Sequence, residues 1–341
     1  MRVRLDAGVQ VVDTCQGRTP GEQRVLVQRG RHVGIVRLLA GIGLAHSGTL
    51  RRRLQYPNNK NLWRSVMTTT TNEQTGSDVG ADGQVPEELV AAYREYGFVR
   101  VRGVLEPDQV KRFRASAEAF LEAHRAESLE KQGVFSQLVN VWQRDQTLRE
   151  LTFDPRLGRI AEQLAGFPLR LWHDQMLVKE PHNNAATEFH QDRPYWPHAG
   201  DRLPLSAWIA LVDVPPERGC MTFLPGTQHR TGLRPQDLHH EEDLFEMDPS
   251  LRWIPRVTVP LRAGDCTFHS GFTGHMALPN RTDQARLAHV TIYMDEATRY
   301  NGTGHIVTDP LGLAVGDRLD GDTFPAPGFS EAGAPATASS G

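Results

Sequence analysis

The chain has 341 residues, of which 39% are hydrophobic and 23% charged, an ordinary composition for a globular protein. Its three cysteines, Cys15, Cys220 and Cys266, lie far apart and form no CxxC pair. This spacing excludes a disulfide framework and a thiolate zinc site, and it favours a reducing, cytoplasmic setting. No run of about 18 apolar residues occurs, so we expect no membrane-spanning segment and no membrane partner.

Charge is distributed unevenly along the chain. Residues 1–66 contain 12 Arg or Lys and 3 Asp or Glu, whereas the whole chain has a net charge of −3. A basic leader suits a nucleic-acid-binding arm or a transit peptide, but this one lacks interleaved aromatic residues and a clean amphipathic period. We therefore expect residues 1–66 to be a disordered extension, or a stretch that lies upstream of a natural start at Met67. We expect no nucleic-acid partner.

The next part of the chain is predicted to be helical with one strand. Residues 67–84 have the Thr-, Gly- and Asp-rich composition of a linker, so folded sequence is expected to begin near Val85. Apolar spacing, prolines at helix starts and glycines at helix ends define the predicted elements. These are a helix over 86–96, a strand over 98–105, a long helix from 107, and a helix from Pro155 that Asp154 caps.

From Leu169 onward the pattern changes to short strands separated by turn residues. The predicted strands cover residues 169–178, 206–214, 221–224, 256–261, 265–269 and 287–294. Segments such as AWIALVDV are too apolar to have one solvated face, which predicts sheets packed against each other or closed. The expected fold is therefore mainly β with flanking α-helices, a sandwich or double-sheet jelly roll over residues 85–324, followed by a disordered tail at 325–341.

A candidate metal site lies in the segment Glu188-Phe189-His190-Gln191-Asp192. In an extended backbone, residues two apart point to the same side, so His190 and Asp192 would point together. A histidine from another strand would complete a two-histidine, one-carboxylate site that leaves positions open for Fe(II) oxygenase chemistry. We choose His275 for this role, with His269 as the competing candidate. Arg286 follows, and its guanidinium suits the carboxylate of an anionic cosubstrate.

The HxD pair alone is weak evidence, but longer segments carry a resemblance. The segments HQDRPYWP, SAWIALVDV, GCMTFLPGTQHR and GDCTFHSGFTGHMALPNRTDQAR occur in this order between His190 and Arg286. Together they resemble the phytanoyl-CoA dioxygenase family of iron(II)/2-oxoglutarate oxygenases. The resemblance extends over about Val85 to Met294.

The resemblance implies a fold, a cofactor set and roles for individual residues. Its members have a double-stranded β-helix, a cupin-like jelly roll, and use Fe(II), 2-oxoglutarate and O2. The implied metal ligands are His190, Asp192 and His275, and the implied cosubstrate-binding residues are Arg286, Trp208 and Gln175. One position departs from the pattern: many relatives have a serine two residues after the distal histidine, where this chain has Ala277. Thr222 or Thr267 is expected to supply the missing hydroxyl.

Other polar and aromatic residues have simpler interpretations. The remaining histidines His173, His198 and His229 are expected to be packed polar groups, with His173 a candidate for the substrate cavity wall. Tyr195 and Trp196 are expected either to stack on substrate or to anchor a turn. The acidic segment around His239-His240 reads as a solvated loop, with a lid as the alternative.

These features predict a 2-oxoglutarate-dependent dioxygenase that hydroxylates an unactivated C–H bond of a small-molecule substrate, with release of succinate and CO2. A carboxylate at Asp192 favours oxidation over halogenation, because related halogenases have a small residue there. The alternatives are a non-catalytic jelly-roll binding protein and a cupin-like metalloenzyme that does not use 2-oxoglutarate. The sequence leaves the substrate, the exact oxidative outcome and the oligomeric state open.

Overall fold

The computed structural model describes residues 10–16, 22–29, 32–39 and 78–326, except residues 132, 201 and 237–242. The chain divides into two compact units, Met1–Asn58 and Asn59–Gly341. The first contains an antiparallel sheet of the strands β1 (Gln10–Gln16), β2 (Glu22–Arg29) and β3 (His32–Leu39). The disorder expected for residues 1–66 does not hold for these three segments, which are rich in valine, a residue that favours strands. For the rest of residues 1–66 it stays a prediction. The linker at 67–77 and the tail at 327–341 lie outside the described residues.

In the second unit, packed residues begin before the expected start at Val85. Val79 is buried, and the Asp78 carboxylate accepts hydrogen bonds from the backbone and the guanidinium of Arg102. The helical part then follows the predicted order. Its elements are α2 (Glu87–Tyr96), β4 (Phe98–Val101), α3 (Pro107–His124), η1 (Arg125–Glu127), β5 (Leu129–Lys131), β6 (Phe135–Val139), η2 (Val141–Gln143), α4 (Gln146–Thr152) and α5 (Pro155–Ala165).

Strand β4 belongs to a large antiparallel sheet of seven strands in the order β4-β13-β10-β15-β7-β6-β5. The remaining members are β7 (Leu169–Lys179), β10 (Leu205–Ala210), β13 (Cys266–Ser270) and β15 (Arg286–Asp295). Helix α5 lies against β10 and places Leu157, Ile160 and Leu164 in the core. The central strands are apolar on both faces because one face meets this helical layer and the other meets a second sheet.

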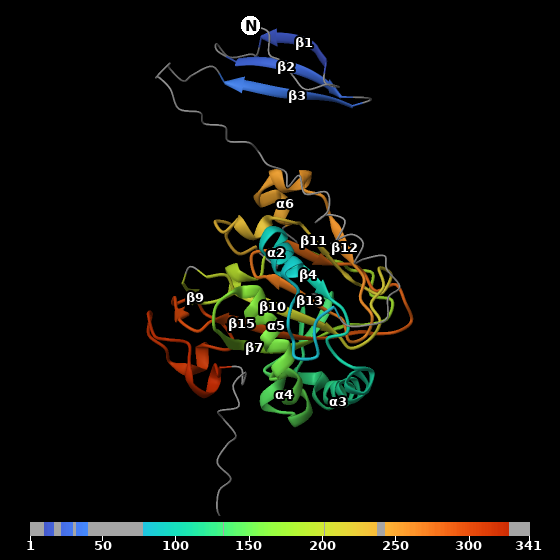
Figure 1. The fold of residues 1–341 in the computed structure, drawn as a ribbon, viewed down its shortest axis with the longest axis vertical. Coiled ribbons are helices and arrows are strands. Elements are labelled where there is room, and N and C mark those ends of the chain that lie inside the picture. Colours follow the sequence, from blue (N-terminus) through green and yellow to red (C-terminus); the bar gives the residue numbers. More distant parts are fainter. Residues whose placement is uncertain are drawn as a thin grey trace, which may run out of the picture. The chain divides into compact units, whose positions relative to one another are not determined.

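The second sheet has four strands in the order β12-β11-β14-β8. They are β8 (Thr187–His190), β11 (Met221–Phe223), β12 (Val257–Val259) and β14 (His275–Ala277). Phe98 of the large sheet stacks on Phe223 of the small sheet at 4.4 Å between ring centroids, so these residues mark the inner faces. The two packed sheets with helices outside form the predicted jelly roll (Figure 1).

Short elements connect the strands and close the chain. These are η3 (Arg193–Tyr195), β9 (His198–Ala199), η4 (Thr227–His229), α6 (Leu244–Met247), η5 (Pro249–Trp253), β16 (Arg299–Tyr300), η6 (Asp309–Leu311) and η7 (Gly321–Thr323). Strands β16 and β9 pair with each other. No helix in the described part of the chain is both long enough and apolar enough to cross a bilayer.

Candidate metal centre

The first two proposed ligands come from the end of β8 and the turn that follows it. His190 is the last residue of β8, whereas Asp192 has helical backbone angles (φ −75°, ψ −43°) and precedes η3. The extended backbone predicted through Asp192 is therefore wrong, because the strand ends two residues earlier. The turn nevertheless brings the side chains together, with His190 Nε2 at 3.4 Å from Asp192 Oδ1.

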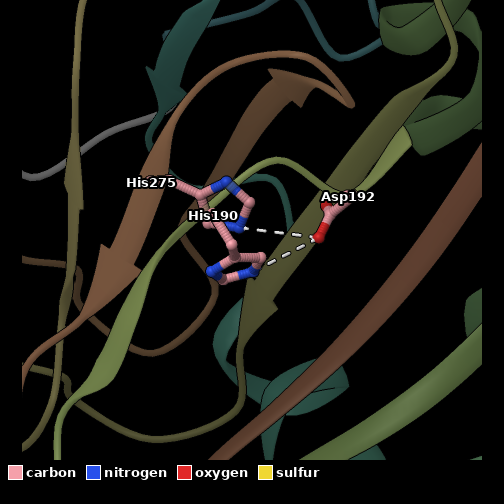
Figure 2. A group of neighbouring side chains, drawn as sticks. All are labelled: His190, Asp192 and His275. Carbon is pink, nitrogen blue, oxygen red and sulfur yellow. Dashed lines mark ion pairs between the residues drawn. The ribbon is translucent and has the colours of Figure 1, made fainter. Parts of the chain in front are cut away.

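His275 reaches the same carboxylate from the neighbouring strand. It is the first residue of β14 and pairs directly with His190 across the β14–β8 ladder. Its Nε2 lies 3.8 Å from Asp192 Oδ1. One ligand atom from each of these three residues lies within 4.8 Å of the others, and Figure 2 shows the two rings facing the carboxylate. Of the predicted candidates, the structure thus groups His190, Asp192 and His275.

Both imidazole rings are oriented by backbone carbonyls. His190 Nδ1 lies 2.7 Å from the carbonyl oxygen of Glu188, and His275 Nδ1 lies 2.9 Å from that of Thr273. A carbonyl accepts a hydrogen bond only from a protonated nitrogen, so each Nδ1 carries a proton, and the neutral form of each ring has its lone pair on Nε2. This is the tautomer that a metal ligand requires, and such outer hydrogen bonds commonly fix the ligand ring.

The electrostatics of the three groups depend on each other. Burial raises the pKa of Asp192, but His275, His190 and His269 outweigh that effect and hold this pKa well below its usual value. Burial lowers the pKa of His275 to about 3. Burial also lowers the pKa of His190, yet its hydrogen bond and charge interaction with Asp192 leave that pKa raised. An anionic carboxylate beside a neutral imidazole is a donor set that suits a divalent cation.

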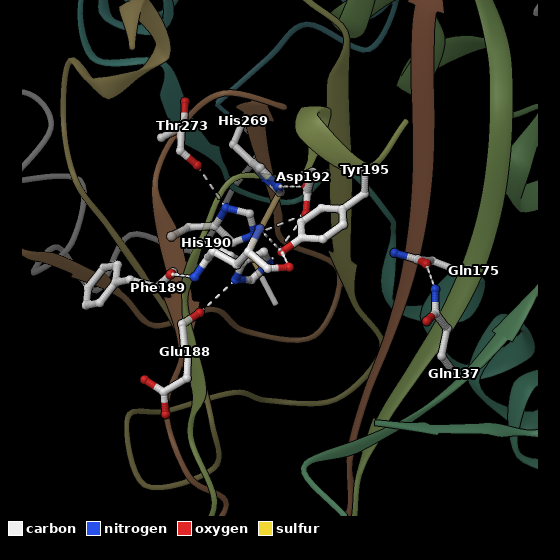
Figure 3. Close-up of polar contacts among 11 residues, drawn as sticks. Gln137, Gln175, Glu188, Phe189, His190, Asp192, Tyr195, His269 and Thr273 are labelled. Carbon is white, nitrogen blue, oxygen red and sulfur yellow. Dashed lines mark hydrogen bonds and ion pairs between the residues drawn. The ribbon is translucent and has the colours of Figure 1, made fainter. Parts of the chain in front are cut away.

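His269, the competing candidate, also lies at this site. It belongs to β13, and its Nε2 is 3.6 Å from Asp192 Oδ2, the oxygen that does not face His190 and His275 (Figure 3). Its ring is almost fully buried and packs at 4.7 Å from the ring of His275. His269 therefore contacts the outer side of the carboxylate and restricts its rotation. The sequence offered His269 as the competing ligand, and the structure places it beside the carboxylate of this group.

Arg286 is a buried cation for which the described residues supply no carboxylate partner. It begins β15, is 2% exposed, and its Nη1 donates a weak hydrogen bond of 3.4 Å to the carbonyl of Leu177. Its Nε has no hydrogen-bond partner, and its guanidinium lies 5.4 Å from the ring centre of Trp208. Burial lowers its pKa to about 10. An unpaired buried guanidinium is costly, so this geometry fits a site for an anion.

Strand register places the other proposed cosubstrate residues on the same inner face. Trp208, Val290 and Gln175 form one row across β10, β15 and β7, and Arg286 lies four residues before Val290 on the same side. The Oε1 of Gln175 accepts a hydrogen bond from Nε2 of Gln137 on β6. Figure 3 shows this amide pair apart from the histidine group, a partner that the sequence did not indicate.

The structure distinguishes the two candidate hydroxyls. Thr267 pairs with Trp208 in the large sheet, so it lies on the inner face, and its buried Oγ1 has no hydrogen-bond partner. Thr222 lies one residue from the inward Phe223 and its Oγ1 is 2.9 Å from that of Thr258, on the outer face. Only Thr267 remains a candidate for the role left open by Ala277.

The other singled-out residues are mostly packed. His173 and His198 are buried in contact with Trp172, whereas His229 is exposed. Trp196 is part of the core, and the Tyr195 hydroxyl accepts a hydrogen bond from the backbone N–H of Gln236 at 3.0 Å. Both aromatic residues thus anchor the turn after the metal pair. The segment around His239-His240 lies outside the described residues.

Comparison with known proteins agrees with this geometry. The sequence profile of the phytanoyl-CoA dioxygenase (PhyH) family matches residues 93–288, more than half of the chain. The chain belongs to this family. It is 25% identical over 222 residues to the peroxisomal phytanoyl-CoA dioxygenase of Rattus norvegicus, covering 58% of this chain and 64% of that protein. It is 29% identical over 142 residues to L-proline trans-4-hydroxylase of Streptomyces griseoviridis, covering 40% and 53%. The chain thus spans less than two thirds of these relatives.

Two solved structures match over nearly their whole length. The non-heme alpha-ketoglutarate-dependent carbocyclase SnoK from nogalamycin biosynthesis is 37% identical, with a TM-score of 0.65 and coverage of 72% of this chain and 98% of that one. The epimerase SnoN, solved with Fe3+, alpha-ketoglutarate and nogalamycin RO, is 40% identical, with a TM-score of 0.64 and coverage of 70% and 97%. The predicted family and jelly-roll fold are confirmed, and SnoN binds the iron and 2-oxoglutarate expected for this family.

Proposed function

We propose that this member of the family is an Fe(II)- and 2-oxoglutarate-dependent oxygenase that acts on a small organic molecule. The proposal rests on the presence of a candidate metal site and a candidate anion site inside the same jelly roll. The group His190, Asp192 and His275 can hold a metal, and Arg286 supplies an unpaired buried cation on the facing sheet. A cupin-like enzyme without 2-oxoglutarate would need no such cation, and a binding protein would need neither site.

The residues have distinct roles in this proposal. His190 and His275 would hold Fe(II) through Nε2 and Asp192 would hold it through Oδ1, which is a two-histidine, one-carboxylate donor set suited to Fe(II) oxygenase chemistry. Arg286 pairs with the distal carboxylate of 2-oxoglutarate through its planar fork of N–H donors, and the Trp208 ring lies against the guanidinium. Thr267 offers a hydroxyl on the same face.

When bound, iron, 2-oxoglutarate and dioxygen supply the oxidant for an unactivated C–H bond, and the cosubstrate leaves as succinate and CO2. The chain positions these groups and excludes water, because Arg286 and the ring of Trp208 are both buried. No side chain is needed as general acid or base. Hydroxylation inserts one oxygen atom of dioxygen into the substrate.

The sequence identities to two solved structures favour a second reaction outcome besides hydroxylation. The carbocyclase SnoK and the epimerase SnoN are 37% and 40% identical to this chain, against 29% for L-proline trans-4-hydroxylase over a shorter stretch. Ring closure removes two hydrogen atoms from the substrate and adds no oxygen, so dioxygen is reduced to water and the oxygen of succinate. Inversion at carbon leaves the substrate at the same oxidation level, so it also requires two electrons and two protons from an added reductant. We therefore include ring closure, or inversion at carbon with such a reductant, in a natural product as the alternative to hydroxylation.

The class and the outcome are tested separately. Anaerobic titration of metal-free protein with Fe(II) and 2-oxoglutarate should produce their visible charge-transfer band. Absence of the band would remove the whole proposal. Turnover of candidate natural products under labelled dioxygen then decides the outcome by product mass. Incorporation of one labelled oxygen indicates hydroxylation, whereas loss of two hydrogens or an unchanged mass without label indicates ring closure or inversion.

A further inference from the structure

Lys179, the last residue of β7, is a buried lysine with only backbone partners. Its exposed fraction is 0%, and its Nζ donates hydrogen bonds to the carbonyls of Ala185 at 2.9 Å and Leu278 at 3.2 Å. Within the described part of the chain, no carboxylate lies at ion-pair distance from this nitrogen. A buried ammonium without a counter-charge is unfavourable, so its protonation needs an explanation.

The number of acceptors matches the neutral amine. An uncharged lysine has two N–H bonds, which Ala185 and Leu278 satisfy, whereas the ammonium has a third N–H for which the structure provides no acceptor. The two carbonyls tie the segment before β8 to the residue after β14. Both the neutral amine and the ammonium of Lys179 can donate these two hydrogen bonds, so the two contacts do not determine its charge.

Lys179 is also the direct cross-strand neighbour of Arg286. The two residues pair in the β7–β15 ladder, so their side chains leave the sheet on the same inner face. Burial and, after it, the positive charge of Arg286 together lower the pKa of Lys179 to about 7. The other titratable group beside Arg286 is Cys220, whose thiol pKa burial raises to about 12, so it stays neutral. Arg286 and Lys179 thus share this face, and the described residues place no anion between them.

We propose that Lys179 is the second cation of the 2-oxoglutarate site and takes up a proton when the cosubstrate binds. The inference rests on the function proposed above. A carboxylate placed on Arg286 cancels the repulsion that Lys179 experiences and offers an acceptor for the third N–H. Lys179 is therefore a positioning residue whose charge depends on the occupancy of the site.

Coupling between protonation of Lys179 and binding of 2-oxoglutarate predicts how the affinity changes with pH. If binding raises the proton affinity of Lys179, binding must be tighter when protons are more available, by reciprocity. Above about pH 7, where Lys179 is neutral in the free protein, the dissociation constant of 2-oxoglutarate should rise by up to roughly tenfold per pH unit. The carboxylates of 2-oxoglutarate are ionised throughout this range and contribute no proton.

The experiment is calorimetric titration of Fe(II)-loaded wild-type protein with 2-oxoglutarate, without oxygen and near pH 8, in two buffers of different ionisation enthalpy. The difference in heat gives the protons taken up, and we expect a value approaching one per cosubstrate. Lys179→Met should abolish this uptake and make the dissociation constant independent of pH. Lys111→Met removes an exposed lysine of α3 and serves as the matched control, with uptake like wild type.

The outcomes separate this inference from the proposed function. If wild type binds 2-oxoglutarate with equal heat in both buffers, Lys179 is not linked to binding and the inference is wrong, while the proposed function stands. Equal uptake in Lys179→Met and wild type would also overturn it, because the proton would then go elsewhere. If wild type binds no 2-oxoglutarate, the proposed function itself fails. Even if Lys179→Met does not fold, equal heats in the two buffers for wild type still overturn the inference.

Discussion

Asp192 has the central position among the proposed ligands. Its Oδ1 is shared between the Nε2 atoms of His190 and His275, and its Oδ2 faces His269. It is the one carboxylate of the group and holds the only negative charge there. The three histidine contacts depend on this side chain, so we expect its loss to be more severe than the loss of any one ring.

Asp192→Ala should weaken Fe(II) binding by more than the roughly 10–100-fold typical of outer-shell changes, because an anionic ligand is removed. The measurement is anaerobic Fe(II) titration together with product yield. Asp283→Ala removes an exposed carboxylate and should behave as wild type. Unchanged iron affinity in Asp192→Ala would show that this residue is not a ligand.

Arg286→Ala should weaken 2-oxoglutarate binding by about 30-fold or more, since truncation of one partner of a buried charge pair costs about 2–5 kcal/mol. Iron binding should change little because no contact joins Arg286 to the metal group. Lysine at this position should restore part of the affinity, as it keeps the charge and loses the planar fork. Titrations with iron alone and with 2-oxoglutarate plus iron test this.

Arg281→Ala changes an exposed arginine nearby and is the control. A loss of 2-oxoglutarate affinity in Arg281→Ala, or in Arg262→Ala, would place the anchor elsewhere.

At the scale of elements, a buried polar cluster joins helix α4 to the outer face of the large sheet. Thr152, the last residue of α4, donates a hydrogen bond of 2.7 Å to Asp174 Oδ2 on β7, and its Oγ1 lies 3.1 Å from Nε2 of His289 on β15. All three side chains are almost completely buried. Because β7 and β15 carry Lys179 and Arg286 at their ends, this contact helps fix the strands that form the cosubstrate face.

Thr152→Val should lower the free energy of unfolding by about 1–3 kcal/mol, because the buried carboxyl group of Asp174 loses one of its hydrogen-bond donors without a large change in volume. Thr147→Val makes the same substitution in the same helix, where the side chain has no hydrogen bond, and should have little effect. Chemical denaturation of both variants provides the comparison. Similar stability of the two would mean that the cluster contributes nothing to the attachment of α4.

At the scale of the whole molecule, the proposed site lies entirely within one compact unit. The unit Asn59–Gly341 contains the metal group, Arg286 and Lys179. The strands β1 to β3 belong to the other unit. The basic extension is therefore not required to complete the metal site or its cosubstrate face.

Removal of residues 1–66 should leave folding and iron binding intact, because every residue of the proposed site lies beyond them. Thermal unfolding and Fe(II) titration of the shortened protein are the measurements, with full-length protein as reference. Loss of a cooperative transition would show that the oxygenase core needs the extension.

The metal-free protein should lose stability as pH falls below about 6.5. Burial lowers the pKa of His173 and His289 to about 3 and that of His198 well below its usual value. The unfolded chain therefore binds more protons in this window, which costs about 1.4 kcal/mol per pH unit for each such histidine. Asp174 acts in the opposite direction, because burial raises its pKa to about 7, but it offsets only one histidine. Urea denaturation near pH 7 and near pH 5 checks the slope; a flat response would contradict neutral burial of these rings.

The sequence by itself determined the class of fold and predicted the residues of the candidate site. Alternation and turn residues predicted the strands that became β7, β10, β13 and β15, because hydrophobic period and turn chemistry are local properties. The capped helix starting at Pro155 was also predicted correctly. The order of the HxD pair, the distal histidine and the arginine predicted the candidate residues His190, Asp192, His275 and Arg286. This was possible because the type of each ligand and the spacing between ligands are properties of the sequence.

Tertiary structure decided what depends on register and on contacts between distant segments. Pairing of β14 with β8 places His275 opposite His190, and the turn after β8, not an extended strand, aims Asp192 at both rings. The inward face of Thr267, the contact of His269 with Asp192 and the position of Lys179 beside Arg286 depend on segments more than 50 residues apart in the sequence. A one-residue change in register would turn each of these side chains to the opposite face, and no local pattern encodes that choice.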